Sequence, residues 1–395
     1  MAASPTAPSR RFYPQLEGLR AVASIGVLTT HVAFQTRATE WPVLGEVLGR
    51  LDLAVALFFA LSGFLLWRPY AAAARDDAAP RPAVGRYFRH RVVRIWPAYA
   101  LVVAVVLLLL PQARGASLTV WLANLSLTQV FVPLTLAPGL TQMWSLSVEV
   151  AFYAVLPVLG LALYRARGAR AGHRVPILLA VAAVSLGWTW ITRLVNLPDG
   201  VEARNWLPGY LSWFIAGLLL AEITAALAVG ATTRRSRVIR ISADRRVMAA
   251  VFVVSYGLAC TPIAGPVGLG DMTHATYVIK MALGAVAAYA VLAPLVLGDG
   301  PFRFLDSPVM NALGRWSYGI FIWHLAVLSI VFGLFGVPMF AGQFVLVWTM
   351  TVIATIAVSA ASYAFVEQPL RSWLSQWERR RAVGRSETVS AGRPG

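Results

Sequence analysis

The chain has 395 residues, of which 58% are hydrophobic and only 13% are charged. Soluble domains usually carry about 25% charged residues, so this composition excludes an ordinary soluble protein. It predicts an all-α polytopic membrane protein. The formal net charge of +17 does not indicate nucleic-acid binding, because the arginines gather in alternate connections between apolar windows, as membrane topology requires. We therefore expect a membrane-lipid partner and no nucleic acid.

Apolar windows of about twenty residues, the length that crosses the hydrocarbon core, predict about ten transmembrane helices. They lie at roughly 17–35, 50–70, 92–111, 144–164, 175–195, 208–227, 246–263, 276–298, 317–336 and 342–366. Arginines cluster before the first window, in the second, fourth and sixth connections and in the C-terminal tail, whereas 112–143, 197–207 and 264–275 are poor in them. Basic connections stay in the cytoplasm, so both termini are expected to be cytoplasmic.

One transmembrane domain is expected over 13–372, between a disordered N-terminal tail at 1–12 and a basic, disordered C-terminal tail at 373–395. The tails are rich in polar residues, glycine and proline, which disfavours a packed core. Lys280 is the only lysine in the chain, as is typical of GC-rich bacterial genomes. The expected localisation is the bacterial plasma membrane, crossed several times.

The first window, LEGLRAVASIGVLTTHVAF, carries Arg20 near one end and His31 near the other. They stand eleven positions apart, about three helical turns, so they share a face and lie roughly 16 Å apart along the axis. An ionisable group in a span costs about 2.5–3.5 kcal/mol on insertion scales, so each needs a partner or a function. A long ligand lying on this face would touch both side chains.

The outer half of the predicted bundle contains a second ionisable group, Glu149 in WSLSVEVAFYAVLP. The predicted topology puts Glu149 at a depth similar to that of His31. A carboxylate paired with His31 would orient the ring and make it more basic, as a general base requires. Two structural alternatives remain open: a helix–helix hydrogen bond for His31, and a salt bridge or a helix-dipole position for Glu149.

An arginine cluster precedes the third window. In RYFRHRVVRIWP, the i, i+3 spacing places Arg86 beside Arg89 and Arg91 beside Arg94 on a helix. Guanidinium groups bind phosphates in a bidentate manner, and the alternative is anchoring to anionic lipid. Glu367, in FVEQP near the end of the last window, is expected to form a structural ion pair with one of these arginines.

Three further polar positions in spans are singled out: His324, Ser62 and Lys280. His324, in WSYGIFIWHLAV, is expected to line a polar cavity or to bond to another helix. Ser62 belongs to the small-residue contact of FFALSGFLL, and Lys280 is expected to snorkel to the surface. The histidines and the one cysteine show no metal-ligand spacing, and no nucleotide-binding loop occurs, so we expect neither a metal nor a bound cofactor.

Taken in order, these segments resemble the membrane-bound acyltransferase 3 family, integral O-acyltransferases that modify envelope glycans, lipids and some macrolides. The family's arginine–ten residues–histidine pattern falls on Arg20 and His31. Its R-x-x-R element falls on Arg91 and Arg94, with the Arg86 pair as an overlapping copy. The chain departs from the family at Ala56, where many members carry an aspartate, and at Gln368, where many carry an arginine. Whether Asp52 replaces the missing carboxylate is left open.

The resemblance implies an acyltransferase with acyl-CoA, expected to be acetyl-CoA, as co-substrate. Its phosphates would meet the arginines, and His31 and Glu149 would act on the acceptor hydroxyl. His324, Ser62 and Tyr318 would line the cavity or stabilise an oxyanion. The acceptor is expected to be an envelope glycan or glycolipid, with a macrolide or another secreted metabolite as the alternative. A transporter or flippase with a His/Glu/Arg path is the alternative from another class.

Overall fold

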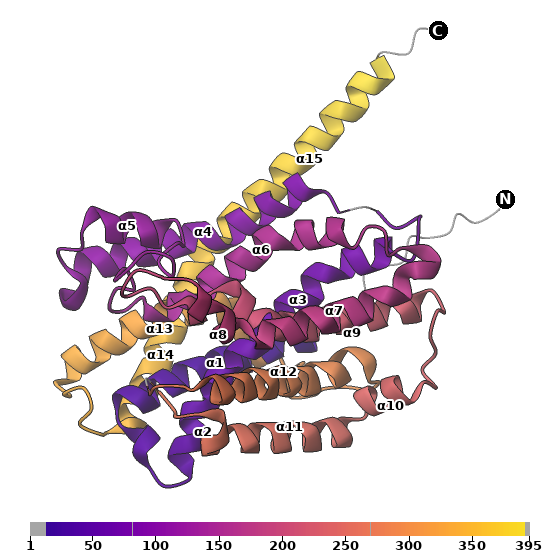
Figure 1. The fold of residues 1–395 in the computed structure, drawn as a ribbon. Coiled ribbons are helices and arrows are strands. Elements are labelled where there is room, and N and C mark those ends of the chain that lie inside the picture. The colour runs from indigo at the N-terminus through magenta and orange to yellow at the C-terminus, as the bar shows by residue number, and fades with distance from the viewer. Residues whose placement is uncertain (1–12, 81, 269, 392–395) are drawn as a thin grey trace.

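The computed structural model describes residues 13–80, 82–268 and 270–391, and these residues form helices and connecting loops without any strand (Figure 1). The helices are α1 (Gln15–Gln35), α2 (Leu44–Arg50), α3 (Ala54–Ala73), α4 (Val84–Leu109), α5 (Leu118–Leu125), α6 (Trp144–Ala162), α7 (Arg174–Leu186), α8 (Trp188–Ile191), α9 (Leu207–Ala228), α10 (Arg237–Ala243), α11 (Arg245–Ala259), α12 (His274–Leu297), α13 (Pro308–Phe335), α14 (Phe344–Ser362) and α15 (Gln368–Ala391).

Eight helical stretches within the described ranges are long and apolar enough to cross a membrane: Leu44–Ala73, Val84–Leu109, Thr141–Ala162, Gly168–Leu186, Ala203–Ala228, His274–Leu297, Pro308–Phe335 and Phe344–Arg381. The expected all-α polytopic membrane architecture is confirmed. Two of the ten expected spans form α1 and α11, which are not among these eight. With 15 residues, α11 is shorter than the about 20 that span the hydrocarbon core. Helix α1 packs against α13, α3 and α14, so its polar residues can face protein.

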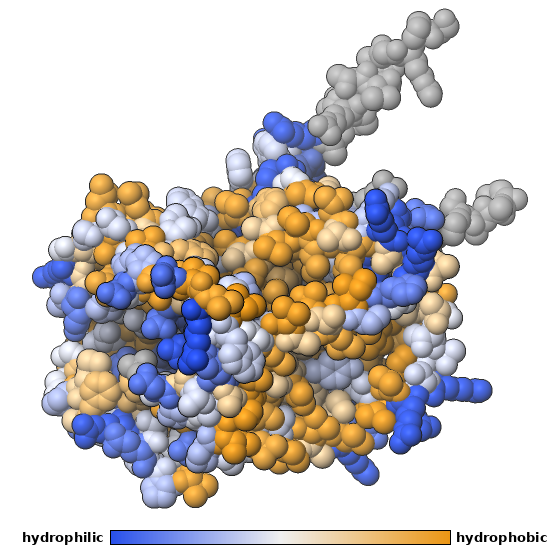
Figure 2. All heavy atoms as spheres, viewed as in Figure 1, coloured by the Kyte–Doolittle hydropathy of each residue, from blue (hydrophilic) through white to orange (hydrophobic). Residues whose placement is uncertain are grey.

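The bundle has two distinct ends. In Figure 1, α5 and α2 lie toward one end, whereas α10 lies at the other and α15 projects from the bundle. Figure 2 shows that apolar side chains cover much of the middle of the visible face, while hydrophilic residues gather mainly toward its edges. This distribution is expected of helices whose apolar central segments contact lipid.

Glycines let the central helices approach closely. A Cβ atom on Gly217 of α9 would overlap the carbonyl oxygen of Ala60, and one on Gly63 of α3 would overlap that of Phe214. Because lipid tails are as apolar as leucine, helices in a membrane associate by such packing rather than by the hydrophobic effect. Gly63, next to Ser62, therefore makes the close contact expected of FFALSGFLL.

A buried ionic cluster joins α3, α7 and α9. Glu222 is fully buried and accepts hydrogen bonds from Trp67 Nε1 at 2.6 Å and Arg174 Nε at 2.7 Å. Arg75 forms an additional ion pair with the same carboxylate. Sequence reasoning did not single out Glu222, whose three partners come from distant parts of the chain. The cluster neutralises a carboxylate that would otherwise be costly within the bundle.

Two expectations require correction. Lys280 does not snorkel: its Nζ lies 2.5 Å from Asp52 Oδ2 in an ion pair, which satisfies the ammonium group inside the protein. The C-terminal tail expected to be disordered from 373 is helical as part of α15 to Ala391. The expected N-terminal tail at 1–12 lies outside the described residues.

Replacing Glu222 by alanine would leave Arg75 and Arg174 with buried, uncompensated charges. Removing one partner of a buried ion pair typically costs about 3–5 kcal/mol, so we expect a clear fall in the thermal unfolding temperature in lipid nanodiscs. Asp77→Ala is the matched control, because Asp77 pairs with Arg167 while fully exposed. Equal unfolding temperatures for the two variants would contradict the structural role of Glu222.

Candidate functional site

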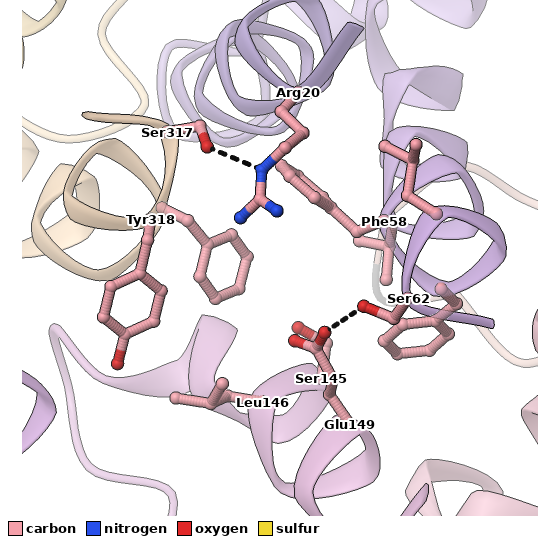
Figure 3. A pocket seen from close by; sticks show the side chains of 12 residues that line it. Arg20, Phe58, Ser62, Ser145, Leu146, Glu149, Ser317 and Tyr318 are labelled. Carbon is pink, nitrogen blue, oxygen red and sulfur yellow. Dashed lines mark hydrogen bonds between the residues drawn. The ribbon is translucent and has the colours of Figure 1, made fainter. Parts of the chain in front are cut away.

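A small internal pocket brings together four of the residues singled out from the sequence. Arg20, Ser62, Glu149 and Tyr318 line a cavity of about 50 Å³, as shown in Figure 3. They come from α1, α3, α6 and α13. A volume of this size holds a few water molecules or a short segment of a ligand.

Arg20 and Glu149 enter this pocket from opposite sides (Figure 3). Arg20 Nε donates a hydrogen bond to Ser317 Oγ at 3.2 Å, and its terminal nitrogens point into the cavity. Glu149 accepts hydrogen bonds from Ser62 and from the Tyr153 hydroxyl, the latter at 2.6 Å. The pocket therefore offers a donor group and an acceptor group to a polar ligand between them.

A cationic cluster adjoins the pocket. The charge of Arg94 on α4 interacts with those of Arg20, Arg91 and Arg371. Arg91 also lies over the Tyr153 ring, 5.6 Å from its centroid. Arg371 was missed by sequence reasoning. It follows Glu367 by one helical turn, and that spacing is the signal that could have identified it.

Glu367 is the acidic neighbour of this cluster. Its side chain is buried at the end of a π-helical turn, Tyr363–Glu367. Its charge interacts with Arg94, Arg371 and Arg20, but the described residues include no ion pair within 4 Å for it. The expected direct ion pair is therefore not formed. One carboxylate among several guanidinium groups leaves a net positive site suited to phosphate.

The second R-x-x-R pair has a different environment. Arg86 Nε lies 3.0 Å from one Glu378 oxygen, and Arg89 Nη2 lies 3.4 Å from the other. Glu378 belongs to α15, so these two arginines connect α4 to α15 at an exposed surface. The structure thus separates the Arg91–Arg94 pair beside the pocket from the Arg86–Arg89 pair outside it.

Further along α1, the ring of His31 lies next to that of His324, with centroids 5.2 Å apart and planes inclined by 37°. His324 is fully buried, and its Nδ1 lies 2.7 Å from the Phe321 carbonyl oxygen. Because a carbonyl only accepts, Nδ1 carries the hydrogen, and in the neutral ring Nε2 keeps its lone pair. That Nε2 is buried and has no hydrogen-bond partner among the described residues.

The expected contact between His31 and Glu149 is not formed: the described residues contain no hydrogen bond or ion pair between them. The main contacts of α6 are with α3 and α9, which place Glu149 away from His31. Glu149 instead faces the pocket that contains Arg20. Phe321 lines that pocket and also contacts His324, with ring centroids 6.0 Å apart. The pocket and the histidine pair are therefore adjacent but distinct.

Asp52 is the carboxylate whose charge reaches His31. It lies in the single turn Leu51–Leu53, which packs against α1, and it is held by Lys280. Many family members carry an aspartate at the position of Ala56. In this chain Asp52, four residues earlier, is a carboxylate within electrostatic range of His31.

A model of the acyltransferase domain family, Acyl_transf_3, matches residues 13–365. The chain belongs to this family. It is 24% identical to O-acetyltransferase OatA of Staphylococcus aureus (strain NCTC 8325 / PS 47), over 92% of this chain and 58% of OatA. It therefore spans less than two thirds of that relative. It is also 25% identical to acyltransferase MdmB of Streptomyces mycarofaciens, over 95% of this chain and 94% of MdmB.

A further relative is nodulation protein 10 of Rhizobium leguminosarum bv. viciae, 28% identical over 89% of this chain and 91% of that protein. No solved structure matches the chain. Two of these three relatives are named acyltransferases, and both align with more than nine tenths of this chain. The family resemblance seen in the ordered motifs is confirmed.

Proposed function

We propose that the chain transfers an acyl group from cytoplasmic acyl-CoA to a hydroxyl group of an acceptor on the outer side of the membrane. The observation that carries this proposal is the arrangement of α1. One helix presents Arg20 to the pocket and to the adjoining cationic cluster and, about 16 Å further along, presents His31 to His324. The phosphates of CoA suit the arginines, and the extended pantetheine arm suits the distance to the histidines.

In the proposed reaction His31 removes the proton of the acceptor hydroxyl while the oxygen attacks the thioester carbonyl carbon. The tetrahedral intermediate collapses by breaking the carbon–sulfur bond. An ester forms, and the proton on His31 passes to the departing CoA thiolate. General-base assistance of this kind is typically worth about 10²–10⁴-fold in rate.

His324 supports His31 in this scheme. With its Nδ1 hydrogen committed to the Phe321 carbonyl, neutral His324 has a hydrogen-bond acceptor, and no donor, at Nε2. It is therefore suited to stabilising the protonated His31 ring rather than an oxyanion. Glu149 and Ser62, which are hydrogen-bonded to each other on the side of the pocket opposite Arg20, are assigned to holding the polar groups of the pantetheine arm.

The acceptor class is part of the proposal. An envelope glycan or glycolipid is favoured, with acetyl as the acyl group, since OatA is named an O-acetyltransferase. A secreted metabolite such as a macrolide is the second acceptor class. A transporter using the same intramembrane groups would bind substrates without releasing CoA from acyl-CoA, so consumption of the donor separates the two classes of function.

Removal of the general base should stop turnover without preventing donor binding. For His31→Ala in nanodiscs with native envelope extract, we expect CoA release from acetyl-CoA to fall about 10²–10⁴-fold, with the Kd for acetyl-CoA unchanged. Free thiol and donor binding would be measured in parallel. An unchanged rate would exclude His31 as the base.

The role of His324 Nε2 can be tested separately from that of Nδ1. In His324→Asn, the amide retains a donor near the Nδ1 position but loses the Nε2 acceptor. We expect this variant to fold and bind acetyl-CoA normally while its rate falls at least about tenfold, a loss of roughly 1.4 kcal/mol, the size of one hydrogen bond. A wild-type rate in His324→Asn would contradict the support of His31 by Nε2.

The adjacent R-x-x-R pairs provide a matched comparison of donor binding. Arg91→Gln/Arg94→Gln should raise the Kd for acetyl-CoA at least about tenfold, because charge-assisted hydrogen bonds contribute about 1.5–3 kcal/mol each. Arg86→Gln/Arg89→Gln removes the same charge but disrupts contacts with α15 alone, to Glu378 and to the Trp377 ring. Equal effects of the two double variants would favour general anchoring to anionic lipid over a phosphate site.

A further inference from the structure

A second, larger cavity lies between two loops that connect spans. It has a volume of about 290 Å³, close to the lower end of the about 300–1,000 Å³ typical of small-molecule sites. One wall comes from the loop that precedes α6 and the other from the loop that precedes α9. It shares no residue with the pocket around Arg20.

The polar lining consists mainly of uncharged groups. Gln129, Thr135 and Asn205 contribute amides and a hydroxyl, and Glu202 is the charged group among the residues that line the cavity. Gln129 is almost fully buried; its Nε2 donates to the Met143 carbonyl at 3.2 Å, whereas its Oε1 has no partner among the described residues. Amides both donate and accept hydrogen bonds, as the hydroxyl groups of a sugar do. Glu202 forms an ion pair with Arg204, whose Nε lies 3.5 Å from Glu202 Oε2. The charge of Glu202 is therefore compensated beside the cavity, which favours an uncharged ligand.

The cavity walls are held in place by bonds between and within the loops. Trp206 Nε1 donates to the Val130 carbonyl at 2.9 Å, and its ring lies 5.3 Å from that of Phe131. Asn124 Nδ2 donates to the Thr135 carbonyl at 2.8 Å. These contacts tie one loop to the other and one loop to α5. A cavity formed in advance loses less entropy when it binds a ligand.

Hydrogen bonds link the cavity wall, through the turn before α6, to α13 near His324. Met143, which accepts the bond from Gln129, ends the short turn Thr141–Met143 that leads into α6. In the same turn, Gln142 Nε2 donates to the Ile322 carbonyl at 3.1 Å, two residues before His324. Both cavity loops are arginine-poor connections that the charge pattern assigns to the outside.

We propose that this cavity is the acceptor subsite and that it takes one neutral sugar unit. The inference rests on the proposed acyl transfer, for which it supplies the substrate class. Glycans, glycolipid headgroups and glycosylated metabolites all contain a sugar unit. The cavity would bind the hydroxyl groups that these acceptors share. The sugar enters from the outer side, and its hydroxyl groups bond to Gln129 and Asn205.

Protection of a single thiol tests this site without requiring turnover. The chain has one cysteine, Cys260, so Cys260→Ser followed by Glu202→Cys places the only thiol on the cavity wall. Asp199→Cys is the matched control, because Asp199 is exposed in the same loop and does not line the cavity.

Right-side-out vesicles would be treated with a membrane-impermeant maleimide. The probes are neutral methyl glycosides of gluco, galacto, manno, N-acetylhexosamine and deoxyhexose type, a glucosyl diacylglycerol in the membrane, and glucuronate.

We expect at least one neutral sugar to slow labelling of the Glu202→Cys thiol threefold or more, with no effect on Asp199→Cys and none from glucuronate. Adding Gln129→Leu, or Asn205→Leu as a second variant, should abolish the protection. Protection only by the glycolipid would identify a lipid-linked sugar, and protection by a methyl glycoside a soluble one. Lack of protection by every neutral sugar, or equal protection of both thiols, would overturn the inference.

The outcomes also separate this inference from the proposed function. CoA release that depends on envelope extract but is unaffected by Gln129→Leu and Asn205→Leu would overturn the subsite and leave acyl transfer standing. Sugar protection in a protein that never releases CoA would support a sugar-binding site at this cavity but would contradict both acyl transfer and the acceptor role.

Discussion

The close contact between α1 and α13 is the constraint on which both functional positions depend. A Cβ atom on Gly18 would overlap the Leu305 carbonyl oxygen next to α13, and one on Gly314 would overlap that of Glu17. Packing of this kind, rather than the hydrophobic effect, holds helices together in lipid. The same helix pair then sets Arg20 against Ser317 and His31 against His324. A shift of α1 along α13 would disturb both contacts together.

The charges within the bundle fall into two groups. Glu222 is paired with two arginines and Asp52 with Lys280, so these carboxylates have cationic partners within the protein. The charges of Arg20 and Glu367 interact, but the described part of the chain contains no ion pair between these two side chains. Because uncompensated charge in a membrane protein is costly, we propose that a charged or polar ligand binds beside these groups.

The sequence predicted the helices and the shared face of α1 well, because apolar length and helical period are local properties. It was harder to predict which helices pack against each other. Glu149 was expected at the depth of His31, but it lines the pocket of Arg20, and its helix packs mainly against α3 and α9. Spacing alone could not separate Arg91 and Arg94 from Arg86 and Arg89, since the difference comes from Glu378 on α15. Glu222 was missed because its partners are distant in sequence, whereas Arg371 was missed although it follows Glu367 by one helical turn.

The most direct test of the central claim is a sided assay in sealed proteoliposomes. Acetyl-CoA labelled in the acetyl group would be enclosed in the lumen, with envelope acceptor added only outside, and the reverse arrangement would be prepared in parallel. The account predicts labelled acceptor when donor and acceptor are on opposite sides, and none in His31→Ala vesicles. Acceptor labelled only when it shares a compartment with acetyl-CoA would contradict transfer across the membrane along α1.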